Sequence, residues 1–147
     1  MKKLPGLAWA LGLGGVVPFA VLSLSLLSAG SIAGIEHATR LDMLLVYAAV
    51  IVSFVGAVHW GVAISTMTPR ASWQLVWSVM PALAAWAILI VPVPVSIKLS
   101  SLAVVLAAAL IEDRFLVYDQ VAEGYARLRL LLTVLVGGCL LLAAVLN

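Results

Sequence analysis

His59 is the one ionisable side chain that lies well inside a stretch of sequence apolar and long enough to cross a membrane. Ionisable residues at such depth are costly and commonly mark a functional site. A helix over residues 42–66 places His59 roughly 12 Å from its C-terminal end. A neutral imidazole there could contact a ligand or relay a proton. The alternative is structural: the ring hydrogen-bonds a neighbouring helix, for example through Ser78 or Thr133.

Several polar and aromatic residues from other predicted helices fall at a similar depth, and a compact bundle would bring them close to His59. Each also has a structural interpretation. Tryptophans anchor helices at the membrane interface, arginines extend toward the headgroups, and Asp113 can pair with a nearby arginine. We therefore predict one ligand-binding or polar cluster and leave both interpretations open for its members. The cluster comprises His59, Trp60, Trp77, Ser78, Asp113, Arg129 and Thr133.

The sequence lacks a complete catalytic or metal-binding set. A bis-histidine haem needs two histidines at matched depth, but His37 falls in a predicted loop. A zinc site needs three or four ligands, which one histidine and the lone Cys139 do not supply. Neither a nucleophile elbow nor a phosphate-binding glycine loop occurs. We therefore predict no catalytic residue, no metal and no cofactor, and a protein that is not an enzyme.

Composition indicates the class of protein that must position these side chains. Of the 147 residues, 65% are hydrophobic and 10% are charged, against about 25% charged in a soluble domain. The mean hydropathy is +1.25, and a soluble fold of this size cannot bury so much apolar surface. The net charge of +2 gives no polybasic surface. These values exclude a soluble enzyme, a nucleic-acid-binding protein and a disordered chain, and they indicate an integral membrane protein.

Five stretches approach the roughly 20 apolar residues that a membrane-spanning helix needs. Each is predicted to be a helix, because backbone groups in lipid must be satisfied within the chain. The predicted fold class is all-α, a single five-helix transmembrane domain over residues 1–147. Its spans lie at about 6–29, 42–66, 72–91, 95–111 and 126–146. The segment 112–125 interleaves apolar and acidic residues, and we expect a short amphipathic helix along the interface there.

The basic residues predict the orientation, because cytoplasmic loops are enriched in lysine and arginine. With the N-terminus inside and the C-terminus outside, only Arg40 and Lys98 fall on the outer side. The basic residues on the inner side are Lys2, Lys3, Arg70, Arg114, Arg127 and Arg129. We expect this orientation in the bacterial inner (cytoplasmic) membrane, or in the mitochondrial inner membrane if the protein is eukaryotic.

Small residues at helical spacing predict where the helices pack, because lipid supplies no hydrophobic driving force between helices. In the second span, small residues four positions apart form one narrow face, and Gly56 belongs to a second face. Pro81 is expected to kink the third span near its middle. The predicted helix-packing residues are Ser53, Gly56, Ala57, Gly61 and Pro81.

Three blocks of the sequence resemble a known family. Residues 47–61 contain Ser-Phe-x-Gly-x-x-His-Trp-Gly, residues 77–86 contain Trp-Ser-Val-Met-Pro and a later tryptophan, and Asp113 with residues 125–133 forms the third block. The chain is similar to a family of uncharacterised small membrane proteins that includes mitochondrial transmembrane protein sixty-nine and many proteobacterial homologues. The resemblance implies five spans, an inner-membrane location and a domain of unknown function. It also implies shared positions at His59, Trp60, Trp77, Ser78, Pro81, Asp113, Arg129 and Thr133.

Two hypotheses about function follow from these patterns. The first is a non-enzymatic accessory or assembly protein, or a lipid- or quinone-associated subunit, of a larger membrane complex. Abundant close-packing faces and incomplete catalytic equipment motivate it. The second is a small-molecule binder or transporter whose pocket lies on the inner side around His59. In both cases the lipid bilayer is the immediate partner, and no nucleic acid is expected.

Overall fold

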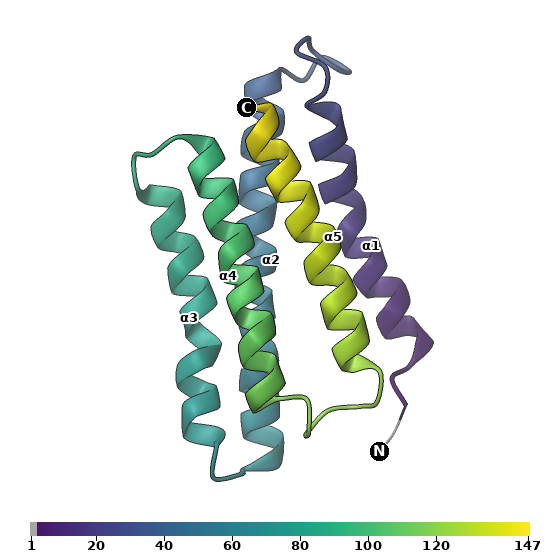
Figure 1. The fold of residues 1–147 in the computed structure, drawn as a ribbon, viewed down its shortest axis with the longest axis vertical. Coiled ribbons are helices and arrows are strands. Elements are labelled where there is room, and N and C mark those ends of the chain that lie inside the picture. Colours follow the sequence, from purple (N-terminus) through teal and green to yellow (C-terminus); the bar gives the residue numbers. More distant parts are fainter. Residues whose placement is uncertain (1–2) are drawn as a thin grey trace.

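The computed structural model describes residues 3–147, which form an all-α bundle of five long helices, as the sequence predicts. Each of these helices is long and apolar enough to cross a membrane. Figure 1 shows the start of the first helix and the end of the last at opposite ends of the bundle. Lys2, which the charge count used, lies outside the described residues. The helices are α1 (Gly6–Ser25), α2 (His37–Thr66), α3 (Ala71–Ile90), α4 (Val95–Leu116) and α5 (Tyr125–Leu146).

Prolines and left-handed backbone residues set several helix ends. Pro5 and Pro94 directly precede α1 and α4, where the N–H groups of the first turn have no intrahelical partner in any case. α2 ends where Met67 adopts a left-handed backbone with φ of 48°. Gly124 turns the chain into α5 with φ of 94°, a conformation that costs glycine little.

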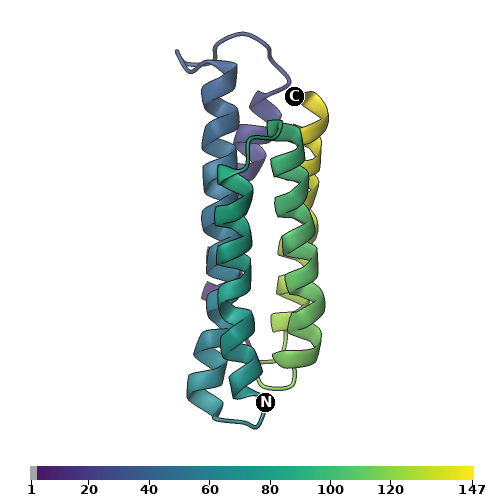
Figure 2. The ribbon, with the colours of Figure 1, turned by 90° about the vertical axis from the view of Figure 1, so that its left-hand side faces the viewer.

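The 30-residue helix α2 lies at the centre of the bundle. It packs against α1, α3 and α4, while α5 lies between α1 and α4 (Figure 1). Figure 2 shows α2 and α3 on one side of the molecule and α4 and α5 on the other. Many large apolar side chains also face outward, as a bundle surrounded by lipid requires. The core contains the fully buried Phe19, Leu44, Leu99, Leu102 and Leu140.

Gly56 lies at the closest approach of α2 and α3. A Cβ atom at this position would overlap the carbonyl oxygen of Ser78 and contact Pro81. The small-residue face that contains Ala57 and Gly61 behaves differently: both residues are exposed, and nothing lies within 4 Å of a Cβ built at Gly61. Within residues 3–147, Ala57 and Gly61 therefore face outward rather than toward a neighbouring helix, while Ser53 on the same face is half-buried. The reason is geometric, because successive residues of a helix point roughly 100° apart and α2 turns its Gly56 side toward α3.

Arg40 ties the start of α2 to the end of α1. The sequence predicts that α1 reaches residue 29 and that α2 begins at 42, but α1 ends at Ser25 and α2 begins at His37. Arg40 is therefore inside a helix and buried. Its guanidinium donates hydrogen bonds to the carbonyls of Ser25, Ser28 and Gly30, at 2.5, 2.9 and 2.6 Å. Ser25 ends α1, and its carbonyl also accepts from the Ser28 N–H, whereas Ser28 and Gly30 lie in the connection that follows. Arg40 thus holds this connection against the start of α2.

The end of α4 also differs from the sequence-based boundary. The helix continues past residue 111 to Leu116, so Asp113 lies within it. The predicted amphipathic helix over 112–125 is wrong, because residues 117–124 form turns. The sequence-based boundary falls where the apolar stretch ends. The helix continues beyond it because the acidic side chain of Asp113 is buried inside the bundle.

Candidate functional site

The carboxylate of Asp113 links three helices inside the bundle. Its Oδ1 lies 2.8 Å from Nε2 of His59 on α2, and its Oδ2 accepts a hydrogen bond from Nε of Arg129 on α5 at 2.5 Å. The side chains of His59 and Asp113 are 0% exposed, and that of Arg129 is 8% exposed. We call these three residues the Asp113 network. It is an ion pair enclosed by protein, with an imidazole on the far side of the carboxylate.

The imidazole of His59 is close to Asp113 without being aligned for a hydrogen bond. Its Nε2 lies within ion-pair distance, yet neither ring nitrogen has a hydrogen-bond partner in residues 3–147. The two partners named from the sequence are engaged elsewhere. Ser78 donates to a carbonyl one turn earlier on its own helix, at 2.6 Å, and Thr133 accepts a hydrogen bond from Arg129. Proximity to the carboxylate and packing therefore hold the ring.

Arg129 does not extend toward the headgroups, which was one interpretation of the sequence. Its Nη1 donates to Oγ1 of Thr133 at 3.2 Å, and its Nη2 has no hydrogen-bond partner among the described residues. The pairing predicted for Asp113 with a nearby arginine is confirmed by its contact with Arg129. A buried pair of this kind is costly to form and more costly to break, because the remaining partner becomes an isolated buried charge.

The other members of the predicted cluster lie around the Asp113 network rather than in it. Trp60 is on another face of α2 and is 49% exposed. Trp77 is half-buried, and its indole Nε1 is buried without a partner in the part of the chain that the structure describes. Ser78 is buried against α2 beside Gly56. The structure thus brings His59, Asp113 and Arg129 together, with Thr133 bonded to Arg129, and leaves the tryptophans outside this group.

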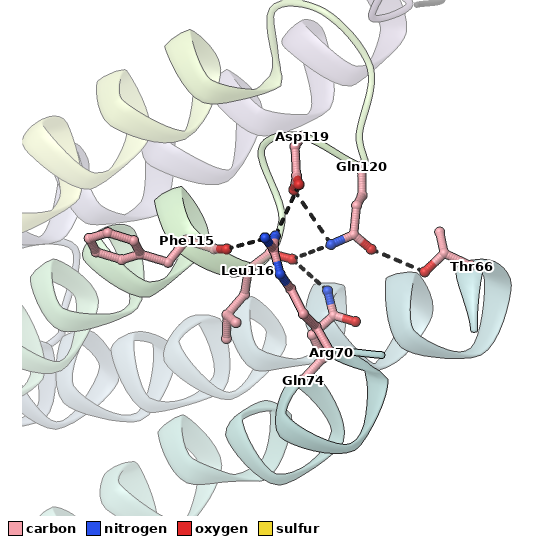
Figure 3. A network of polar contacts seen from close by, with 7 residues as sticks. All are labelled: Thr66, Arg70, Gln74, Phe115, Leu116, Asp119 and Gln120. Carbon is pink, nitrogen blue, oxygen red and sulfur yellow. Dashed lines mark hydrogen bonds and ion pairs between the residues drawn. The ribbon is translucent and has the colours of Figure 1, made fainter. Parts of the chain in front are cut away.

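A second polar network closes the end of the bundle where α4 leads toward α5 (Figure 3). The fully buried Gln74 donates through Nε2 to the carbonyl of Leu116 at 2.5 Å, and Gln120 donates to the same carbonyl at 2.7 Å. Arg70 pairs with the Asp119 carboxylate at 3.0 Å. Gln74 is not a member of the predicted cluster, although an amide inside an apolar span is a signal that could have identified it.

Apolar side chains separate these two networks. Val62 on α2 lies one turn beyond His59, and Leu116 and Val117 lie one turn beyond Asp113; all three are buried and pack together. These apolar side chains therefore cover the Asp113 network on the side that faces the α2–α3 and α4–α5 connections.

A cavity of about 210 Å³ lies beside the Asp113 network, between α1, α2 and α5. Arg129 and Thr133 form part of its wall, Tyr125 is near one end, and most of the remaining lining is apolar. Leu11 and Phe54 also line it, and each is 68% exposed, so the cavity reaches the outer surface between α1 and α2. Figure 1 shows α1 diverging from α2 toward its N-terminal end.

Two tyrosines stand near the Asp113 carboxylate. The rings of Tyr118 and Tyr125 meet edge to face, with centroids 6.0 Å apart. Tyr118 lies in the turn after α4. Partial burial raises the pKa of its phenol above the ordinary value, and the negative charge of Asp113 adds to the rise. The phenol of Tyr118 is therefore neutral at physiological pH and adds no charge beside the network.

These features define a class of protein: an all-α bundle built to span a membrane, with an enclosed ion pair next to a cavity that opens on its apolar surface. Within that class, the chain belongs to the family described as "Protein of unknown function (DUF3429)", which matches residues 4–145. No curated protein and no solved structure matches it. Because the family assigns no activity, the function must be argued from the geometry.

Proposed function

We propose that the chain is a non-enzymatic multi-pass membrane protein that binds a lipid- or quinone-like molecule, as an accessory component of a larger membrane complex. The cavity between α1, α2 and α5 is the observation that supports this proposal. It is lined mostly by apolar side chains, it opens where the bundle meets lipid, and a buried guanidinium forms part of its wall. Ligand sites commonly combine an apolar lining with a few such polar groups.

The size of the cavity suits part of a membrane molecule. Its volume of about 210 Å³ exceeds that of the engineered cavity of ~150 Å³ that binds benzene. It is therefore large enough for a ring or a short acyl segment. Because the rim residues Leu11 and Phe54 are largely exposed, the rest of such a molecule can extend into the bilayer. A ligand can enter from the lipid without crossing the bundle.

The second hypothesis, a small-molecule binder or transporter with an inner-side pocket around His59, has less support. The cavity contacts Arg129 and Thr133 but not His59. The imidazole is fully buried, and apolar side chains enclose it toward the nearer end of the bundle. Binding beside the Asp113 network therefore suits the geometry better than passage through it.

Native mass spectrometry of the protein extracted with its surrounding lipids tests the proposal. We expect the monomer to retain one apolar molecule after the bulk lipids are stripped. Release of the bare chain under conditions that preserve its fold, checked by circular dichroism, would contradict ligand binding. A second polypeptide at fixed stoichiometry in the same spectra would support the accessory role, and its consistent absence from gently solubilised membranes would argue against it.

A matched pair of variants on α1 links the retained ligand to the cavity. Gly15 lines the cavity, and a Cβ built there meets only Tyr47 Oη, at 3.9 Å. Gly15→Leu is therefore expected to fill the space and to reduce retained ligand at least tenfold. Gly14 is exposed, with nothing within 4 Å of a built Cβ, so Gly14→Leu controls for the helix propensity of leucine. Equal retention by both variants would place the ligand elsewhere.

The location of the protein belongs to the same proposal. The resemblance to a family that includes mitochondrial transmembrane protein sixty-nine and proteobacterial homologues supports an inner membrane, bacterial or mitochondrial. The excess of basic residues on one side supports an N-terminus inside and a C-terminus outside. Separation of inner and outer membranes on a density gradient tests the location, and recovery in the outer-membrane fraction would contradict it.

A further inference from the structure

One nitrogen of the Arg129 guanidinium, Nη2, is buried without a hydrogen-bond partner among the described residues. Nε of the same guanidinium is used by Asp113 and Nη1 by Thr133. The side chain is more than nine-tenths buried, and both Arg129 and Thr133 line the cavity. Leaving such a donor buried and unpaired is unfavourable, and more so when the group is charged. Nη2 is itself enclosed by protein atoms, so an acceptor in the cavity reaches it only when the guanidinium turns toward the cavity, and that contact would then remove the cost.

The charge around Arg129 is already balanced. The positive guanidinium is paired with the fully buried carboxylate of Asp113. The groups near that carboxylate are the imidazole of His59 from α2 and the phenols of Tyr118 and Tyr125, while α1 contributes no titratable residue. A carboxylate or phosphate in the cavity would place a second negative charge beside one arginine in a medium of low dielectric, where unbalanced charge is expensive.

An uncharged hydrogen-bond acceptor would pair with Nη2 of Arg129 and would add no second negative charge beside Asp113. The oxygen of an ester or quinone carbonyl accepts a hydrogen bond and brings no net charge. The mostly apolar lining suits the carbon skeleton around such a group, and the opening flanked by Leu11 and Phe54 leaves room for a long chain to continue into lipid. A water bonded to Arg129, Thr133 or Tyr125 has enough polar partners, but it would leave the apolar side chains that form most of the lining without a partner.

We propose that the cavity receives the uncharged carbonyl end of an apolar membrane molecule, with the carbonyl oxygen accepting a hydrogen bond from Nη2 of Arg129. This inference rests on the proposed function and specifies its ligand: a neutral ester lipid or a quinone, and not a fatty acid or an anionic phospholipid. The role of Asp113 is then to neutralise the guanidinium so that the site prefers uncharged head groups.

Competition against tritiated methyl oleate, with the full-length protein in nanodiscs of one phospholipid, tests the inference. The competitors are methyl oleate, a benzoquinone with a decyl chain, octadecene and oleyl sulfate, which is ionised at every working pH. We expect one or both carbonyl compounds to compete at least tenfold better than octadecene, which has no acceptor, and than oleyl sulfate, which is charged. The better of the two carbonyl compounds identifies the source of the ligand.

The outcomes separate this inference from the proposal on which it rests. Octadecene competing as well as the carbonyl compounds would mean an apolar cavity without recognition by Arg129, which overturns the inference and leaves ligand binding intact. Preference for oleyl sulfate would overturn it through the charge argument. Methyl oleate binding that is unaffected by Gly15→Leu would instead count against the cavity and hence against the proposed function.

A charge-removing variant gives a second test. Asp113→Asn keeps the size of the side chain and an oxygen for Arg129 Nε, but it leaves the guanidinium without its counter-ion. We expect the order of the ligands to reverse, with oleyl sulfate now displacing methyl oleate, because an anion supplies the missing charge. An unchanged order in the folded variant would overturn the inference. If the variant does not fold, the competition series on the unmodified protein decides the question by itself.

Discussion

At the scale of single residues, Asp113 organises the interior. One carboxylate meets nitrogen atoms from two other helices, and all three side chains are removed from solvent. The attraction between the two buried ions offsets the cost of removing each from water, so the loss of either partner leaves an uncompensated charge. This dependence can be measured by removing the partners singly and together.

Arg129→Met is expected to lower the free energy of unfolding by about 3–5 kcal/mol, because it leaves the Asp113 carboxylate buried and unpaired. Thermal unfolding in detergent, followed by circular dichroism, measures the change. Arg127 provides a matched control, since it is two residues away on α5 and exposed. Arg127→Met should change stability by no more than about 0.5 kcal/mol.

The double variant Asp113→Leu/Arg129→Met isolates the charge pairing. With both charges removed no isolated ion remains, so we expect the double variant to be more stable than Arg129→Met alone. Losses that simply add would show that packing around Arg129, and not its pairing with Asp113, determines stability.

The sequence predicts part of this network. The depth of His59 in an apolar span indicates a buried polar cluster, and the pairing of Asp113 with an arginine is confirmed. Of the two interpretations left open for Arg129, extension toward the headgroups is wrong, because its position near the start of α5 indicates depth but not direction. Its partner on α4 lies 16 residues earlier in the chain, and no local spacing reveals such a contact.

At the scale of helices, the contact of α2 with α3 depends on the absence of one side chain. Gly56→Ala places a methyl group where the Ser78 carbonyl lies, so the helices must separate, and we expect a loss of about 1–3 kcal/mol. Gly61→Ala is the control, because its Cβ meets nothing within 4 Å. Replacing this helical glycine should raise the free energy of unfolding by roughly 0.5–1 kcal/mol. Thermal unfolding distinguishes the two, and equal effects would contradict the close approach.

The hydrogen bonds of Arg40 to the end of α1 predict a second helix-scale effect. Arg40→Met removes three hydrogen bonds from a charged donor, and we expect a loss of at least about 2 kcal/mol, since such bonds are stronger than neutral ones. Lys98→Met removes a single bond, to the carbonyl of Leu89, and should cost less. Hydrogen exchange at the end of α1 should accelerate in the Arg40 variant only, and exchange unchanged there would argue against this role.

Helix existence and helix ends differ in how far they follow from sequence. Apolar runs of sufficient length predict the five helices of residues 3–147, because lipid leaves the backbone no alternative. The ends of α2 and α4 do not follow, since Arg40 and Asp113 are charged residues that continue a helix by pairing with groups distant in the chain. The outward-facing Ala57 and Gly61 likewise show that a small-residue pattern does not say which face a neighbour covers.

At the scale of the whole molecule, the cavity results from how α1 leans on the bundle. From Gly15 onward it is fixed to α2 by the Tyr47 hydroxyl, which donates to the Gly15 carbonyl at 3.0 Å, and by the tilted contact between the rings of Phe19 and Tyr47. Toward its N-terminal end α1 packs on α5 instead and diverges from α2 (Figure 1). The sequence predicts the helices but not this divergence, which depends on the packing of all three.

The orientation of the bundle can be predicted more sharply with the structure than from the sequence. Arg40 and Arg129 are buried in contacts within the bundle, so neither should count in the charge bias of the loops. The remaining basic residues favour the side of the α2–α3 and α4–α5 connections still more strongly. That side is assigned Lys2, Lys3, Arg70, Arg114 and Arg127, and the other side is assigned only Lys98. We therefore predict that those connections face the cytoplasm or matrix.

Single cysteines at two exposed serines test this orientation in a Cys139→Ala background, which removes the one native thiol. Ser31 lies in the α1–α2 connection and Ser72 at the start of α3, at opposite ends of the bundle. In intact cells or mitoplasts, an impermeant maleimide is expected to label Ser31→Cys at once and Ser72→Cys only after the membrane is opened. The two sites share the same native residue, so intrinsic reactivity cannot explain a difference. Labelling in the reverse order would invert the topology and bring the Asp113 network to the outer half of the membrane.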